Sequence, residues 1–162
     1  MYFQTADLVD DFFDEVEVGW SILNSYGSIG KFFGPIETIR TFEDNSKVRA
    51  QLESPGHGRI LVVDGGASLN CALLGDSLAG LAAENGWKGI IINGCIRDRI
   101  ALSEIPIGIM ALGTCPKKSI KQNRGEVGLD LFFANMKFAV GMWLYCDEDG
   151  MLGAGRNLLA SN

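Results

Sequence analysis

Histidine and long hydrophobic runs are scarce in this sequence. The chain of 162 residues contains one histidine, and no apolar run approaches the roughly 18 residues of a membrane-spanning helix. A Ser-His-Asp triad or a phosphohistidine relay would have to use His57, but its place between two glycines favours a solvent-exposed turn. The first residues include acids where a signal peptide carries positive charge. We therefore expect a cytoplasmic protein with no membrane partner.

Basic residues are also in deficit. The chain has 14 lysines and arginines against 20 acidic residues, which gives a formal net charge of −6. Binding to a phosphate backbone depends on basic faces, so this balance argues against direct contact with nucleic acid. The same acidic surface would permit a cationic protein partner.

Cysteine pairs of the metal-binding or redox type are absent. The four cysteines are Cys71, Cys95, Cys115 and Cys146. None of them forms a CxxC pair, and three lie in apolar or strand-like surroundings. We expect them to be reduced core residues. Without a cluster of histidine and cysteine, zinc is not expected.

Motifs for nucleotide binding and Schiff-base chemistry are missing as well. There is no GxGxxG or GxxxxGK[ST] pattern, so the turn Asp64-Gly65-Gly66 supports a nucleoside or methyl-transfer site only weakly. Lys88 precedes a predicted strand, and Lys117, Lys118 and Lys121 lie in a polar loop. Because no lysine is well placed for a Schiff base, carbonyl chemistry would need a metal.

The composition is that of a folded domain, with 47% hydrophobic and 21% charged residues. We expect one domain over residues 1–162, of mixed α/β class. Helices are predicted from a Thr5 cap through Phe13, from a cap at Asp44 or Asn45 through Leu52, from Gly75-Asp76 to Asn85-Gly86, and just after Asp98. Strands are predicted at residues 36–42, 60–63, 90–92 and 108–112, with antiparallel strands at 127–133 and 142–146 and a hairpin turn at Asp149-Gly150.

Two of these strands set the expected position of the site. Residues 60–63 and 90–92 are apolar throughout, closed by Asp64-Gly65-Gly66 and Asn93-Gly94, and separated by a helix. Such a spacing predicts a parallel βαβ unit, in which both strands end at the edge of the sheet where ligands usually bind. Asp76 and the pair Arg97-Asp98 should therefore meet in one pocket with a helix N-terminus.

Each of these residues also has a purely structural interpretation. Asp76 could only cap its helix, although the following amides would still be able to bind a carboxylate. Arg97 could form an ion pair with Glu104, or its planar fork could hold a carboxylate or a 2-oxo group. Asp98 could cap the next helix, or bind Mg²⁺ or Mn²⁺ together with several waters.

At these positions the chain resembles the RraA-like family, which comprises the regulator of ribonuclease E activity A and metal-dependent 4-hydroxy-4-methyl-2-oxoglutarate aldolases. The resemblance is looser before Gly34. The matching segments are Thr41–Asn45, Ile60–Gly66, Leu74–Asp76, Asn85–Trp87, Gly94–Asp98, and Tyr145 with Asp147, Asp149 and Gly150.

The resemblance implies a single ββα swivelling-type domain with a central parallel βαβ unit and antiparallel C-terminal strands, assembled as a ring-shaped homotrimer. It also implies that the backbone amides of Gly75, Asp76, Ser77 and Leu78 bind pyruvate. Arg97 would hold the carboxylate and oxo oxygen of the substrate, Asp98 would ligate the divalent cation, and Asp76 would order water on that ion.

The family divides in function, so two activities are in competition. Regulators of the ribonuclease can lack the acid after the arginine, whereas this chain has both Asp76 and Asp98. We therefore expect a Mg²⁺- or Mn²⁺-dependent aldolase that acts on a small 2-oxo acid, with oxaloacetate decarboxylation as a side activity. The alternative is a protein-binding inhibitor of ribonuclease E.

Overall fold

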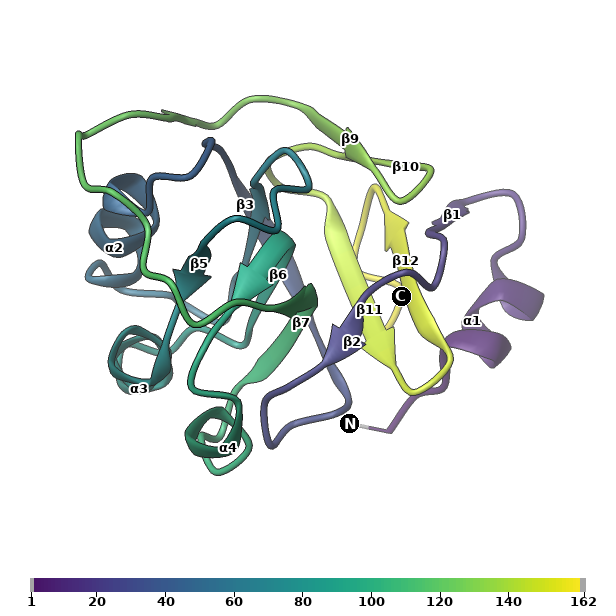
Figure 1. Ribbon diagram of the computed structural model, residues 1–162. Coiled ribbons are helices and arrows are strands. Elements are labelled where there is room, and N and C mark those ends of the chain that lie inside the picture. The colour runs from purple at the N-terminus through teal and green to yellow at the C-terminus, as the bar shows by residue number, and fades with distance from the viewer. Residues whose placement is uncertain (1, 161–162) are drawn as a thin grey trace.

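The computed structural model describes residues 2–160. In chain order its elements are α1 (Thr5–Asp11), β1 (Val16–Val18), β2 (Asn24–Ser25), β3 (Phe32–Arg40), α2 (Ser46–Leu52), β4 (Ile60–Asp64), β5 (Ala72–Leu74), α3 (Asp76–Glu84), β6 (Gly89–Ile96), α4 (Arg99–Leu102), β7 (Gly108–Thr114), β8 (Glu126–Val127), β9 (Leu131–Phe133), β10 (Met136–Phe138), β11 (Trp143–Asp147) and β12 (Gly150–Ala154). Figure 1 shows α2, α3 and α4 together beside the central strands, with α1 at the far end of the molecule.

The central sheet is parallel in its middle and antiparallel at its margins. Its strand order is β1-β12-β11-β3-β4-β6-β7-β2, and β5 and β8 pair with β6 and β3 outside this path. The neighbours β3, β4, β6 and β7 run parallel, whereas β11 pairs antiparallel with both β12 and β3. The chain is thus one mixed α/β domain, and the predicted parallel βαβ unit is present as β4, α3 and β6.

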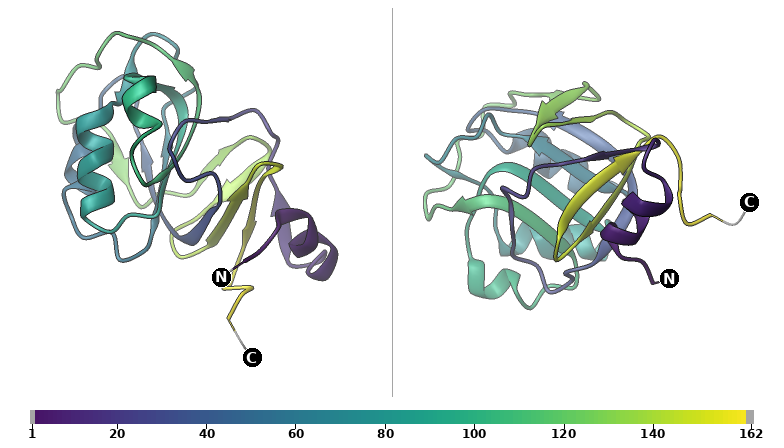
Figure 2. Two further views of the ribbon diagram at one scale, coloured as in Figure 1. Left: turned by 90° about the horizontal axis from the view of Figure 1, so that it is seen from below. Right: turned by 90° about the vertical axis from the view of Figure 1, so that its right-hand side faces the viewer.

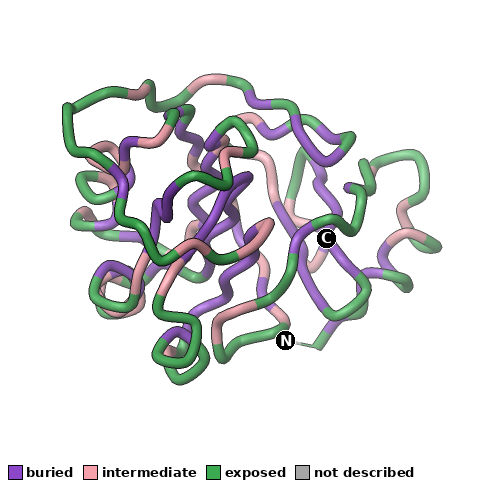
Figure 3. Tube along the Cα trace, viewed as in Figure 1, coloured by how far each residue is buried: buried purple, intermediate pink, exposed green. Residues whose placement is uncertain are grey.

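Both faces of the parallel strands are covered, which explains why their sequences are apolar throughout. Along β4, Leu61 and Val63 belong to the core under α2 and α3, whereas Ile60 and Val62 belong to a second core on the opposite face. The hairpin β9–β10 and the strands β11 and β12 close that second core. Figure 3 shows the resulting continuous burial through the central strands, with exposed loops around them.

A third core joins α1 to the β11–β12 hairpin, at the end of the molecule away from α2 and α3 (Figure 2). The predicted Thr5 cap is wrong, because Gln4 occupies the N-cap position. Thr5 instead donates hydrogen bonds to Asp147 from its backbone N and from Oγ1, both at 2.7 Å. Burial raises the pKa of Asp147, but the hydrogen bonds from Thr5 and Asp149 outweigh it and hold the pKa below its ordinary value.

Three predicted strand boundaries need correction. The second βαβ strand does not stop at Asn93-Gly94; β6 continues to Ile96 through an irregularity in its pairing with β7. The run 127–133 is two strands, because Gly128 has a φ of +86° and the chain leaves β3 there to form the hairpin β9–β10. The strand predicted at 36–42 begins at Phe32 and ends at Arg40. The hairpin at Asp149-Gly150 is confirmed, with Asp147 opposite Gly150.

The prediction of free core cysteines is confirmed for three of the four. All four are free; Cys71, Cys95 and Cys146 are buried and Cys115 is half-buried. Burial raises the pKa of the Cys71 and Cys95 thiols, which keeps them protonated near neutral pH. Within residues 2–160, no helix is both long enough and apolar enough to cross a bilayer.

Candidate active site

Two neighbouring parallel strands deliver the predicted site residues to one place. β5 lies beside the last residues of β6, with Leu74 opposite Ile96. The chain therefore leaves the sheet at Gly75-Asp76 and at Arg97-Asp98 side by side, and the Arg97 N–H donates to the Leu74 carbonyl at 2.9 Å. The backbone N of Asp76 lies 3.2 Å from Oδ2 of Asp98. The predicted convergence of Asp76, Arg97 and Asp98 is present in the structure.

Gly75 allows this approach by leaving space for the carboxylate. A Cβ atom on Gly75 would lie 2.7 Å from Oδ2 of Asp98 and 3.5 Å from Cγ of Arg97, and the first of these distances is too short for any real contact. The φ of Gly75 is −131°, which any residue can adopt. The glycine thus leaves room for the Asp98 carboxylate in its present position, and the backbone conformation does not require it.

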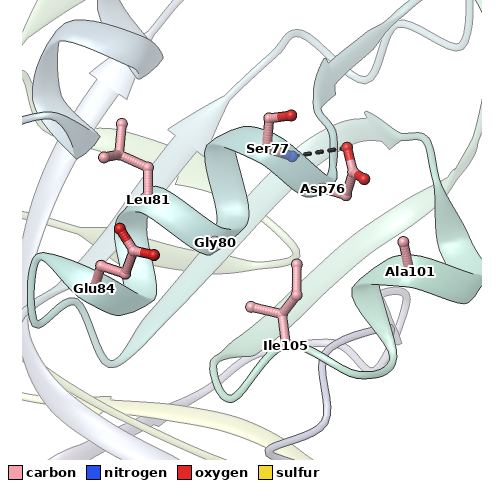
Figure 4. Close-up of a pocket in the computed structure, with 7 residues that line it drawn as sticks. All are labelled: Asp76, Ser77, Gly80, Leu81, Glu84, Ala101 and Ile105. Carbon is pink, nitrogen blue, oxygen red and sulfur yellow. Dashed lines mark hydrogen bonds between the residues drawn. The ribbon is translucent and has the colours of Figure 1, made fainter.

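The N-terminus of α3 presents its amides at the same point. Gly75 occupies the N-cap position and has no side chain with which to cap the helix; Asp76 is the first helical residue and not the cap. Oδ1 of Asp76 accepts a hydrogen bond from the Ser77 amide at 2.7 Å (Figure 4). The Leu78 side chain is buried in the core under the helices, and its amide has no acceptor within residues 2–160. One helix-end donor is therefore available to an anion.

Asp98 has a strained backbone and an exposed side chain. Its φ and ψ are 61° and 40°, a left-handed conformation that costs a non-glycine residue roughly 1 kcal/mol or more and is often retained at functional sites. Asp98 occupies the N-cap position of α4, and its carbonyl accepts the Leu102 N–H at 2.9 Å. The side chain makes no capping bond, however, and its carboxylate points to the start of α3.

Arg97 is half-buried between these elements. The alternative of an ion pair with Glu104 is wrong, because the ion pairs formed within residues 2–160 do not include Arg97. The guanidinium is therefore free to contact a ligand. His57, by contrast, is exposed before β4, at the opposite edge of the parallel strands, as predicted.

A pocket of about 150 Å³ encloses the convergence point. Its lining combines the predicted residues with others from α2 and from the loop after β7: Asn45, Arg49, Ala72, Leu74, Gly75, Asp76, Ser77, Leu78, Arg97, Asp98, Lys118, Ser119 and Lys121. Four of these side chains are cationic and two are anionic. The pocket thus carries excess positive charge in an acidic protein, which suits a substrate with more than one carboxylate.

Sequence reasoning missed the roles of Arg49, Lys118 and Lys121 in this lining. Both lysines were placed correctly in a polar loop, but nothing local indicates where that loop lies. The carbonyl of Lys117 accepts the Ala72 N–H at 2.8 Å, which fixes the loop against β5 and hence beside the site. Hydrogen bonds to backbone carry no residue-type signal, so the sequence offered no clue.

The buried carboxylate of Asp44 anchors the other end of this loop. Asp44 is fully buried and accepts hydrogen bonds from the backbone N and Oγ of Ser46, and from the backbone N of Gln122 and Arg124. Burial raises the pKa of Asp44, but these bonds outweigh it and lower the pKa to about 2. Asp44 thereby ties the loop that bears Lys118 and Lys121 to the start of α2.

The donor set suits a hard divalent cation. Within residues 2–160 no three histidine, cysteine or acidic side chains gather in a metal-binding cluster. The carboxylates that line the pocket are those of Asp76 and Asp98. Mg²⁺ commonly binds through one or two carboxylates and retains several waters. Oδ1 of Asn45 is buried and finds no hydrogen-bond partner among residues 2–160, which leaves one acceptor for a ligand at the wall of the pocket.

Comparison with known proteins gives matches over nearly the whole chain. The sequence profile of the family described as "RraA-like: Aldolase/RraA" matches residues 5–152. A "Putative 4-hydroxy-4-methyl-2-oxoglutarate aldolase" from Laribacter hongkongensis is 49% identical over 159 residues, covering 98% of this chain and 100% of the relative. A protein of the same name from Alkalilimnicola ehrlichii is 47% identical and covers 96% of each chain.

Solved structures with the same fold carry different names. A protein from Geobacillus kaustophilus HTA426, described as an S-adenosylmethionine: 2-dimethylmenaquinone methyltransferase, matches with a TM-score of 0.96 and 47% identity, covering 99% of each chain. The RNA-processing inhibitor RraA from Thermus thermophilis matches with a TM-score of 0.94 and 42% identity, also over 99% of each chain.

Proposed function

Because the chain belongs to the RraA-like family, we propose that it is a divalent-metal-dependent aldolase that cleaves 4-hydroxy-4-methyl-2-oxoglutarate into two molecules of pyruvate. The observation that carries the proposal is the meeting of Asp76, Arg97 and Asp98 in a pocket with excess positive charge. The proposal includes Mg²⁺ or Mn²⁺ as the cofactor, held by Asp98 with Asp76 nearby. When bound, the cation polarises the 2-oxo group.

The side chains of the pocket fit the two ends of this substrate. The guanidinium of Arg97 would bind the first carboxylate and the 2-oxo oxygen, with the Leu78 amide as a further donor to the carboxylate. Arg49, Lys118 and Lys121 would hold the distal carboxylate. These contacts orient the substrate so that the bond between C3 and C4 lies inside the pocket.

The reaction then needs one bond to break and two proton movements. The C4 hydroxyl loses its proton and becomes the carbonyl of one pyruvate, while the electron pair of the C3–C4 bond forms the enolate of the other. Protonation of C3 completes the second pyruvate. Arg97 would stabilise the negative charge that develops on the enolate oxygen, which lowers the barrier because the charge appears only as the bond breaks. Oxaloacetate would lose CO₂ through the same enolate, as a side activity.

A coupled pyruvate assay tests the proposal. Pyruvate release from 4-hydroxy-4-methyl-2-oxoglutarate and from oxaloacetate should require Mg²⁺ or Mn²⁺ and disappear in Asp98→Ala. Asp10→Ala, an exposed acid on α1, is the matched control and should retain full activity. Full activity of the wild-type enzyme in excess chelator would refute the mechanism.

Assembly as a homotrimer, with the site near a subunit boundary, is part of the same proposal. An open groove of about 500 Å³ between α3 and α4 begins at Asp76 and Ser77 and extends to Ile105 (Figure 4). Ile100, next to the lining residue Ala101, is 85% exposed and would supply an apolar contact to a neighbouring subunit. Light scattering on the purified protein would measure the mass, and a monomer at micromolar concentration would contradict the trimer.

A second candidate function is the binding and inhibition of ribonuclease E. It is favoured by the structural match to the RNA-processing inhibitor from Thermus thermophilis. The net charge of −6 suits a basic segment of that enzyme. A salt-sensitive pull-down that survives Asp98→Ala, from a protein that forms no pyruvate, would support this function in place of catalysis.

Methyl transfer at the turn Asp64-Gly65-Gly66 has less support from the geometry. Oδ1 of Asp64 accepts hydrogen bonds from the Gly66 N–H at 3.0 Å and from the Asn93 side chain at 2.9 Å. One of the two carboxylate oxygens that could bind a ribose is thus already engaged within the protein. Calorimetry with S-adenosylmethionine would test this function directly, and specific binding would revive it.

A further inference from the structure

A second and larger pocket lies at the opposite edge of the parallel strands. It has a volume of about 760 Å³ and shares no lining residue with the candidate active site. The segment before β4, the end of α3 and the start of β3 enclose it. This volume is in the range of pockets that hold small organic ligands.

We call this pocket, at the edge where the parallel strands begin, the amino-edge pocket. Several of the side chains that line it are aromatic, and contacts with neighbouring residues hold them in place. Phe33 stacks on Tyr145 with ring centroids 5.6 Å apart and planes 3° apart, and on Trp143 at 6.2 Å and 29°. The indole N–H of Trp87 donates to the Ser54 carbonyl at 3.0 Å, with the Arg59 guanidinium 4.8 Å from its ring centroid. A planar ligand would therefore meet preformed surfaces and would need little rearrangement of the protein.

Phe32 forms part of the same lining, and its ring packs against two glycines, Gly89 and Gly108. Cβ atoms on Gly89 and Gly108 would lie 2.4 Å and 2.2 Å from its ring, so the ring rests directly on the backbone at the start of β6 and β7. The adjoining wall is thus rigid as well as apolar.

The charged groups of this pocket are all of one sign. Its charged lining residues are Lys31 and Lys88, and none of its lining residues is acidic, in a chain with 20 acidic residues. The exposed Lys88 forms no ion pair within residues 2–160. Nζ of Lys31 donates to the Phe3 carbonyl at 2.8 Å and lies 4.7 Å from the Tyr2 ring centroid, so its ammonium retains further donors.

From these observations we propose that the amino-edge pocket binds a small aromatic carboxylate. The ring would pack against Phe33 and Trp143, the half-buried aromatic side chains of the lining, and the carboxylate would be held by Lys88 and Lys31. Neutral and cationic aromatic molecules would find the same surfaces but no counter-charge, so the lysines make the pocket selective for the anion.

Calorimetry with three indole derivatives of similar size tests the proposal. At pH 7.5 the anion indole-3-acetate should bind about tenfold more tightly than the cation tryptamine, with neutral indole between them, as expected for one charge interaction of about 1.4 kcal/mol. Added salt should narrow this difference, because the lysines are partly exposed to solvent. Equal binding of indole-3-acetate and tryptamine, or no binding of indole-3-acetate, would overturn the proposal.

Variants locate the binding site. Lys88→Gln should weaken indole-3-acetate binding by about fivefold or more and leave indole unchanged, because one ammonium is lost and the ring surfaces remain. Ala83→Trp should fill the pocket and abolish binding of all three compounds, with circular dichroism and thermal melting used to confirm folding. Lys121→Gln, in the candidate active site, is the matched control. Loss of binding in Lys121→Gln with normal binding in Lys88→Gln would refute the assignment.

Discussion

The buried carboxylate of Asp44 should make the protein sensitive to acid. Its pKa is lowered from an ordinary value of 3.8 to about 2 in the folded protein, because four hydrogen bonds favour the charged form. At about 1.4 kcal/mol for each pKa unit, this difference corresponds to roughly 2.5 kcal/mol of folding free energy. Because the folded pKa is the lower one, this stabilisation is complete above about pH 4 and is lost as the pH falls towards 2.

Asp44→Asn tests this reasoning. The amide replaces one acceptor oxygen with a donor group, so N–H groups that now point at the carboxylate would face another donor. We expect the free energy of unfolding at pH 7 to fall by about 2–4 kcal/mol, measured by urea denaturation with tryptophan fluorescence. The difference between wild type and variant should shrink between pH 4 and pH 2.

Asp10→Asn, an exposed substitution on α1, is the control and should follow the wild type at every pH. Other carboxylates with lowered pKa values, such as Asp147, also contribute to acid unfolding, but they are common to both proteins and cancel in the comparison. If Asp44→Asn unfolds at the wild-type urea concentration at pH 7, the anchoring role of Asp44 is refuted.

Three glycine substitutions give further predictions. Gly75→Ala would push the Asp98 carboxylate away, so kcat should fall at least about tenfold. The free energy of unfolding should fall by less than about 1 kcal/mol. An unchanged kcat in steady-state kinetics would contradict this prediction. Gly108→Ala would collide with the Phe32 ring and should cost about 1–3 kcal/mol, visible as a lower melting temperature. Gly80→Ala, inside α3 with nothing within 4 Å, should stabilise the protein by about 0.5–1 kcal/mol, and a lower melting temperature would count against the packing described.

The parallel unit and α3 were predictable because their signals are local. β4 and the first part of β6 are apolar runs buried on both faces, and Asn85-Gly86 marks the end of α3. The sequence also indicated that Asp76 and Asp98 would meet, because consecutive parallel strands end at one edge. β5 was missed because three apolar residues carry neither the length nor the alternation of a recognisable strand.

The rest of the site depends on contacts that leave no trace in residue type. Lys118 and Lys121 reach the pocket because backbone hydrogen bonds and the buried Asp44 hold their loop beside β5. The left-handed conformation of Asp98 is likewise set by its surroundings. A sequence pattern reports propensity and periodicity, whereas these features come from the assembled tertiary structure.

The exchange of partners along β6 has a consequence for how this protein can change over evolution. β4 ends at Asp64 and β5 begins at Ala72, so the chain between them is an excursion from the sheet, in which Leu69 is 65% exposed. Residues inserted beside Leu69 would lengthen the excursion without altering the register that places Leu74 opposite Ile96. The length of this excursion can therefore vary while Arg97 and Asp98 keep their positions.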